Sequence, residues 1–174
     1  MDAPGFVEKF AGITENESVN NAIYDSSVEM LKHRNGTNFE DIHFIDADTG
    51  DIIHKLDTCN IPNGVDYDDE TKKAIADARK AGRRIIAVHN HPGGLPPTLD
   101  DGVSAYNNDY VMGVSVGHNL EVFSYGKTDY SYSKKECKEL HGLISNALRF
   151  ELNLMMKYGI LLLGSMEWRF SVNE

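Results

Sequence analysis

Cysteine is scarce in this sequence: its 174 residues include only two, Cys59 and Cys137. The two are far apart and form no Cys-x-x-Cys unit, which argues against a structural zinc site built from thiolates and indicates no disulfide framework. Free thiols of this kind suit a reducing compartment.

Long apolar runs are missing as well. The longest, from Gly159 to Gly164, is far too short to cross a bilayer. The first residues, Met1 to Pro4, have neither the basic region nor the apolar core of a signal peptide. We therefore expect a soluble, cytoplasmic protein with no membrane partner.

Positive charge is in deficit, because 17 Lys and Arg face 27 Asp and Glu and leave a net charge of −10. Proteins that bind a phosphate backbone usually carry a basic patch, so we expect no nucleic-acid partner, although segregated charge would still permit one. The 41% hydrophobic and 25% charged residues are ordinary for a globular protein, and the length suits one domain.

Hydrophobic periodicity predicts an alternation of helices and strands. Helices are predicted at about 16–33, 69–80 and 99–106, with a long one at 133–158, and strands at 41–46, 52–56, 84–89, 111–116 and 120–125. This order predicts an α/β or α+β fold, with a mixed central β-sheet flanked by helices. The strand at 84–89 is almost continuously apolar, which indicates a central position covered on both faces.

We divide the chain into three parts: an N-terminal helical segment (1–36), a core (37–130) and a C-terminal segment (131–174). The long helix of the last segment is expected to pack with its tail on the core. Its Leu and Met face suits core packing or a homodimer interface better than a ligand site.

The most informative stretch directly follows the apolar run 85–88. It reads His89-Asn90-His91-Pro92-Gly93-Gly94-Leu95-Pro96-Pro97-Thr98-Leu99-Asp100-Asp101. Alternate residues of a strand point to the same face, so both imidazoles can reach one metal ion, and Asp101 can return as a third ligand after the Pro/Gly turn. Two histidines and one carboxylate, with a fourth position left open, are typical of catalytic zinc.

The string His-x-His-Pro, a Pro/Gly loop and Ser/Thr-x-x-Asp resembles the motif of the JAMM (JAB, or MPN+) zinc metalloproteases. The form Val-His-Asn-His-Pro-Gly-Gly is most similar to RadC-like members and to JAB-type domains of phage and mobile elements. The resemblance covers roughly Glu40 to Tyr125. It implies a JAMM/cytidine-deaminase-like sandwich for the core, and a metallopeptidase or isopeptidase acting on a protein or peptide such as a ubiquitin-like or phage protein.

The resemblance also implies roles for the site residues. His89, His91 and Asp101 would bind Zn²⁺, with water as the fourth ligand. Thr98 stands where the family has a serine that helps hold the water or the oxyanion, and its extra methyl group is expected to reduce activity. The family also needs a glutamate as general base, and Glu40, just before the strand at 41–46, is our candidate.

Two assignments within the motif stay open. The loop after the histidines is one residue shorter than the usual form, so a strict count would place Leu99 and Gly102 at the serine and aspartate positions, where neither has suitable chemistry. We therefore align Thr98 with the serine and Asp101 with the aspartate, and Asp100 remains a lesser candidate ligand. For the base, Asp41 and Glu29 are rivals of Glu40.

Two other functions also remain open. A RadC-like protein with a nucleic-acid-related role would be favoured by a basic groove beside the site. A non-catalytic JAB-fold scaffold would be favoured by a Glu40 carboxylate far from the metal. An HNH nuclease is not indicated, because its three motif residues are dispersed over a ββα unit rather than contiguous.

Overall fold

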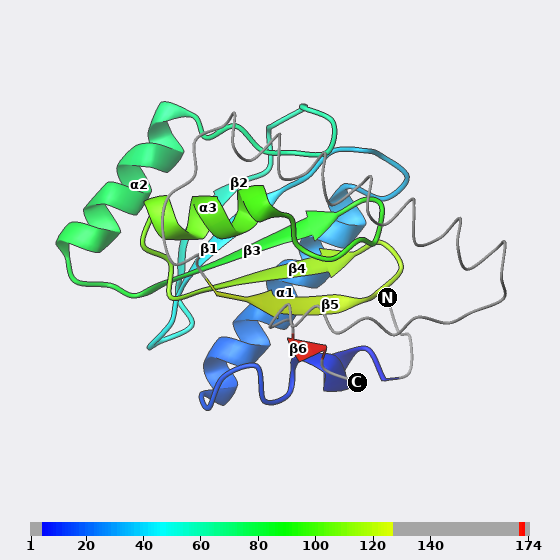
Figure 1. Ribbon diagram of the computed structural model, residues 1–174. Helices are drawn as coiled ribbons and strands as arrows, with labels where there is room; N and C mark the ends of the chain where they lie inside the picture. The colour runs from blue at the N-terminus through cyan, green and yellow to red at the C-terminus, as the bar shows by residue number, and fades with distance from the viewer. Residues whose placement is uncertain (1–4, 127–170, 173–174) are drawn as a thin grey trace, which may run out of the picture.

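The structure is a computed structural model that describes residues 5–126 and 171–172 (Figure 1). Its elements are η1 (Val7–Phe10, a 3₁₀ helix), α1 (Glu17–His33), β1 (Ile42–Asp46), β2 (Ile52–Leu56), α2 (Asp69–Lys80), β3 (Ile85–His91), α3 (Leu99–Asn107), β4 (Met112–Gly117), β5 (Val122–Tyr125) and β6 (Ser171–Val172). Every helix and strand predicted between residues 16 and 125 is present. The long helix predicted at 133–158 lies outside the described residues.

The strands form one six-stranded sheet in the order β2-β1-β3-β4-β5-β6. β3 pairs antiparallel with β1 and parallel with β4, and the remaining pairs are antiparallel. The predicted mixed sheet of an α+β protein is therefore confirmed. All seven residues of β3 are buried, as expected for an apolar strand with a neighbour on each side.

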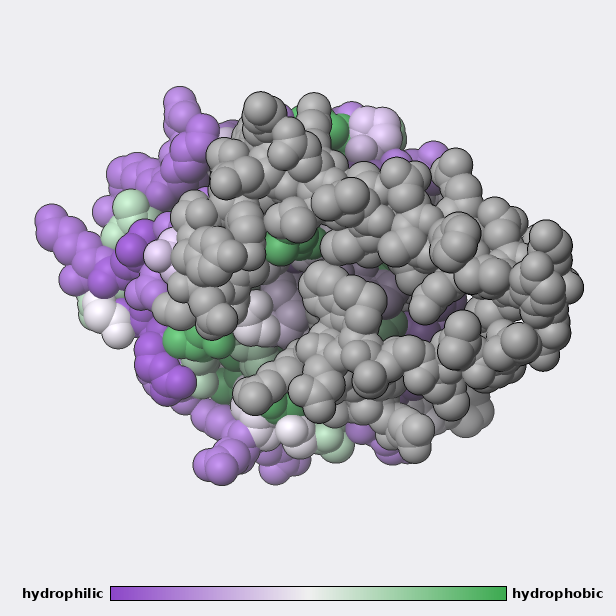
Figure 2. All heavy atoms as spheres, viewed as in Figure 1, coloured by the Kyte–Doolittle hydropathy of each residue, from purple (hydrophilic) through white to green (hydrophobic). Residues whose placement is uncertain are grey.

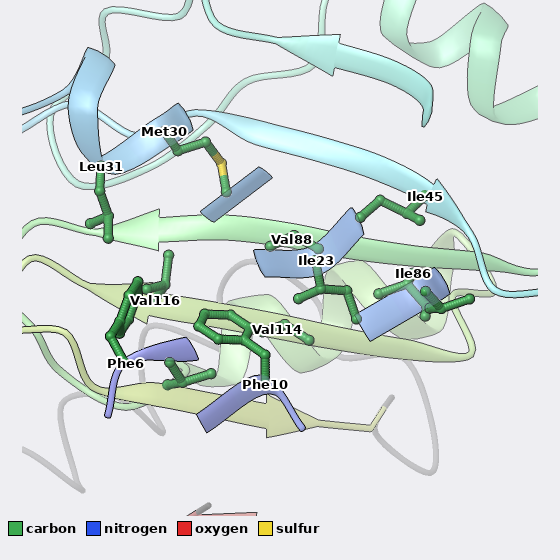
Figure 3. Packing of buried hydrophobic residues seen from close by; sticks show 12 residues of the cluster. Phe6, Phe10, Ile23, Met30, Leu31, Ile45, Ile86, Val88, Val114 and Val116 are labelled. Carbon is green, nitrogen blue, oxygen red and sulfur yellow. The ribbon is translucent and has the colours of Figure 1, made fainter. Parts of the chain in front are cut away.

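Helices cover both faces of the sheet (Figure 1). α1, from the N-terminal segment 1–36, packs on β1, β3 and β4. Ile23 and Met30 of α1 lie against Val88 of β3 and Val114 of β4 in one apolar cluster (Figure 3). This cluster fixes one face of β3 and leaves the other for α2, α3 and the histidines.

The opposite face holds a second apolar cluster in which Phe44 and Ala87 of the sheet meet Ile75 of α2 and Ala105 of α3. Asp68 is the N-cap of α2, and its side chain accepts a hydrogen bond from the Thr71 N–H, a strong helix-start signal. The outer surface of α2 is hydrophilic (Figure 2). Within the described residues, no helix has the length and apolar character that a membrane span requires.

Candidate metal centre

The last residues of β3 bring two imidazoles together. His89 and His91 lie two positions apart on the strand, so both leave the sheet on the same face. Their Nε2 atoms are 2.8 Å apart, and both side chains are nearly inaccessible to solvent. The predicted pairing of the two histidines at the end of a buried strand is therefore confirmed.

Asp101 reaches the histidines from the first turn of α3. Its Oδ1 lies 3.4 Å from His89 Nε2, and its Oδ2 lies 3.6 Å from His91 Nε2. Asp100, the alternative ligand, is exposed on the same turn and does not belong to this cluster. The chain thus converges on three possible metal ligands from two elements that are separated by the Pro/Gly loop.

The spacing of these atoms suits a metal ion. A tetrahedral zinc with bonds of about 2.0–2.1 Å needs ligand atoms about 3.3 Å apart. The three ligand atoms all lie within 4.8 Å of one another, and no other group of three His, Cys, Asp or Glu in the described part of the chain comes this close. The triad can therefore hold a metal ion.

The protonation of the triad also suits metal binding. His91 donates from Nδ1–H to the Leu95 carbonyl oxygen at 2.8 Å, so its lone pair lies on Nε2, the atom that faces His89 Nε2. Burial lowers the pKa of His89 to about 4, which leaves this imidazole neutral at pH 7. Burial alone would raise the pKa of Asp101, but the two histidines and hydrogen bonds from Thr98 outweigh it, so this pKa lies below its ordinary value.

Thr98 is the N-cap of α3 and makes two hydrogen bonds to the Asp101 carboxylate. The Thr98 hydroxyl donates to Asp101 Oδ2 at 2.8 Å, the Thr98 backbone N–H donates to the same oxygen at 2.6 Å, and the hydroxyl accepts from the Asp101 N–H. This reciprocal arrangement is a capping box. The described contacts of the hydroxyl are therefore with a metal ligand rather than with the space where a substrate would lie.

Glu40 lies in the short segment that precedes β1. β1 is in register with β3 so that Ile42 pairs with His89, which brings this segment to the histidine end of the sheet. Glu40 is only 8% exposed, and burial together with the negative charge of Asp101 raises its pKa to about 8. Among the described residues, no hydrogen bond or ion pair engages its carboxylate. At this pKa most of the Glu40 carboxyl is protonated at pH 7 when the triad holds no metal. The positive charge of a metal ion on the triad would lower this pKa, and the carboxylate could then act as a general base.

Both rivals of Glu40 are engaged elsewhere. Asp41 is buried in ion pairs with Arg34 and His33, at 2.5 and 2.7 Å. Glu29 pairs with Lys55 at 2.5 Å and is half exposed on α1, which covers the opposite face of the sheet from the histidines. Of the three acids, Glu40 has the carboxylate without an ion-pair partner in the described residues.

Sequence reasoning did not identify Asn90, the residue between the two histidines. Its side chain points to the other face of β3 and is fully buried. Its Oδ1 accepts from the Asp41 N–H at 2.8 Å, and its Nδ2 donates to the Phe39 carbonyl at 3.1 Å and lies 3.1 Å from His118 Nε2. Asn90 thus fastens the backbone on both sides of Glu40 to the strand that bears the histidines.

Comparisons with known proteins add no name to this geometry. No protein-family model matches the sequence, and no curated protein matches it.

Proposed function

We propose that this protein is a zinc-dependent metallopeptidase of the JAMM type that hydrolyses a peptide or isopeptide bond. The observation that carries the proposal is the meeting of His89, His91 and Asp101 with a buried Glu40 carboxylate that responds to the Asp101 charge. Two imidazoles and one carboxylate, with room for a further ligand, form the donor set of catalytic zinc.

Bound zinc would polarise the substrate carbonyl and lower the pKa of a coordinated water to about 7. Glu40 accepts the proton of the attacking water and returns it to the leaving amine. Thr98 holds Asp101 in its ligating orientation, and Asn90 holds the Glu40 segment beside β3. The pairing of β1 with β3 supports these roles, because it brings the Glu40 segment to the end of β3 that carries the histidines.

The alternative of a nucleic-acid-related protein receives little support. Basic side chains do gather in a hollow lined by Arg79, Lys80, Arg83 and Arg84. This hollow lies at the start of β3, whereas the histidines lie at its end, so it is not a groove beside the site. The non-catalytic alternative requires a Glu40 far from the triad, whereas the effect of the Asp101 charge on the pKa of Glu40 favours a Glu40 near the triad.

The test combines metal analysis with a search for cleavage. Wild type, His89→Ala and Glu40→Gln are each analysed for bound zinc, then incubated with a proteome-derived peptide library and with ubiquitin-like conjugates joined by isopeptide bonds. We expect one zinc per wild-type chain, loss of zinc in His89→Ala, and retained zinc in Glu40→Gln, with cleavage by wild type alone.

Two results would contradict the proposal. Wild type purified without chelators and still free of zinc would remove the metal centre. Equal cleavage by Glu40→Gln and wild type would leave the zinc site standing but reject Glu40 as the base.

A further inference from the structure

Two buried polar atoms beside the metal centre have no hydrogen-bond partner in the described part of the chain. One is Nδ1 of His89, and the other is Oγ of Ser115, a fully buried residue of β4. Leaving a buried polar group unpaired destabilises the folded state, so two such groups on neighbouring strands need a physical explanation.

The sheet places these two residues next to each other. In the parallel ladder between β3 and β4, His89 is in register with Ser115. Residues in register on neighbouring strands project to the same face, so the Ser115 side chain leaves the sheet beside the His89 side chain. On the other flank of His89 the residue in register is the apolar Ile42 of β1.

Other neighbours give His89 Nδ1 no partner. The Tyr125 ring packs edge-on against the His89 ring, with centroids 6.0 Å apart and planes at 80°. The third unpaired buried atom, Nδ1 of His43, belongs to a residue in register with Val88 and therefore projects to the opposite face of the sheet. Ser115 is the polar residue in register with His89.

The chemistry of a metal ligand explains why such a partner is needed. A histidine that binds metal through Nε2 almost always donates its Nδ1–H to an oxygen, which fixes the tautomer and the ring orientation. His91 has this partner in the Leu95 carbonyl. For His89 the candidate partner is the hydroxyl of Ser115, the residue in register with it on β4.

We propose that the Ser115 hydroxyl is the positioning group of His89: it accepts the hydrogen bond from Nδ1–H when Nε2 binds the metal. The hydroxyl proton is free to rotate toward other acceptors, so a neutral serine can serve as acceptor without adding charge to the site. This inference rests on the metal centre of the proposed function and extends it to β4.

The main experiment compares Ser115→Thr with Ser115→Val, which have nearly the same shape and differ in the hydroxyl. Zn²⁺ affinity is measured by competition with a chromophoric chelator. We expect Ser115→Thr to bind Zn²⁺ about as tightly as wild type and Ser115→Val to bind it about 10–100-fold more weakly. Equal affinities of the two variants would overturn the proposal.

A matched control separates this effect from the general cost of removing a buried hydroxyl. Ser27 is also fully buried, but it lies on α1 and donates to the Ile23 carbonyl at 2.8 Å. Ser27→Ala is expected to lower stability and to leave Zn²⁺ affinity unchanged, whereas Ser115→Ala should weaken Zn²⁺ binding. If Ser27→Ala weakened Zn²⁺ binding as much as Ser115→Ala does, the effect at Ser115 would follow from lost stability alone. That result would contradict the proposal.

A second measurement does not depend on metal affinity or on activity. Side-chain ¹⁵N–¹H NMR of His89 reports which ring nitrogen carries the proton. With zinc bound, wild type should hold it on Nδ1 with slow exchange, and zinc-saturated Ser115→Ala should give faster exchange. Wild type that binds no zinc would contradict the proposed function and this inference together. Zinc binding by wild type with an unchanged His89 spectrum in Ser115→Ala would reject the Ser115–His89 hydrogen bond alone.

Discussion

Thr98 and Asp101 form a capping box at the first turn of α3, in which the side chain of each residue accepts a hydrogen bond from the backbone N–H of the other. Two hydrogen bonds from Thr98 end on one oxygen of Asp101, so the carboxylate is oriented before any metal arrives. Such preorganisation spares the ordering of a flexible side chain when the metal binds. A threonine serves this purpose as well as a serine, because the capping box uses only the hydroxyl and the backbone.

The first prediction follows from this pair. Thr98→Val should weaken Zn²⁺ binding and also destabilise the metal-free protein by about 0.5–2 kcal/mol, because the N-cap hydroxyl is lost. Thr98→Ser should retain both properties. Zinc titration and urea unfolding of the two variants measure these effects. If Thr98→Val bound zinc as wild type does, Asp101 would not depend on its cap.

The buried His43 is a single residue that makes the stability of the fold depend on pH. Its imidazole is buried on β1 beneath α1, and burial lowers its pKa from 6.5 to about 4. Because the unfolded chain accepts this proton more readily than the folded one, the contribution of His43 is complete above pH 6.5 and declines as the pH falls toward 4. The full loss is at most about 3 kcal/mol at 1.36 kcal/mol per pKa unit.

The second prediction is that His43→Leu flattens this decline. Urea unfolding of wild type and variant between pH 7 and 4 should show a smaller fall of the unfolding free energy in the variant. The idea fails if His43→Leu and wild type lose stability in parallel over this range.

At the scale of elements, β3 organises both halves of the site. Its two histidines face α3, and Asn90 between them faces the other way and fixes the segment before β1. One face of β3 thus carries the two candidate metal ligands, and the other face carries the side chain that fixes the backbone on both sides of Glu40. This arrangement ties the proposed base, far earlier in the chain, to the strand that bears the histidines.

The third prediction tests this connection. Asn90→Ala should keep the zinc and lose most peptide cleavage, because it releases the Asp41 N–H and the Phe39 carbonyl that flank Glu40. Hydrogen exchange of the Asp41 amide should become faster, and this readout needs no substrate. Asn108→Ala is a suitable control, because that side chain caps only its own helix end. Unchanged Asp41 exchange in Asn90→Ala would contradict the assignment.

For the whole molecule, the triad links α3 to the centre of the sheet. His89 and His91 belong to β3, and Asp101 belongs to a helix that follows a Pro/Gly loop, so a metal ion held by the triad would join the two elements. A ligand that binds only the folded state stabilises it by about 2.7 kcal/mol at a concentration 100 times its Kd. Metal loading should therefore be visible as thermal stabilisation of the fold.

The fourth prediction is that zinc raises the melting temperature of wild type and that a chelator reverses the rise. His89→Ala should melt at the same temperature with and without zinc, whereas Glu40→Gln should respond as wild type does. Differential scanning calorimetry with matched buffers measures the three proteins. A zinc-dependent rise that persists in His89→Ala would place the bound metal elsewhere.

The order of elements and the metal ligands were accessible from the sequence, because both depend on local patterns. The apolar run before His89 predicted a central strand, and alternation along that strand predicted that His89 and His91 share a face. The spacing from Thr98 to Asp101 likewise selected Asp101 over Asp100, and the structure places only Asp101 in the cluster. The long C-terminal helix lies outside the described residues and stays a prediction.

The sequence by itself predicted the three candidate ligands. His89 and His91 are two apart on one strand and therefore share a face. Asp101 follows from its spacing to Thr98 at a helix start, because backbone geometry brings these two residues together. Only the tertiary structure showed that Asn90 fixes the segment around Glu40 and that Ser115 lies in register with His89. Glu40, Asn90 and Ser115 come together through strand pairing between segments distant in the chain, and no local pattern encodes such registers. The resemblance to a zinc peptidase thus rests on thirteen residues and on Glu40 as candidate base, and the pairing of β1 with β3 brings the Glu40 segment to the histidine end of the sheet.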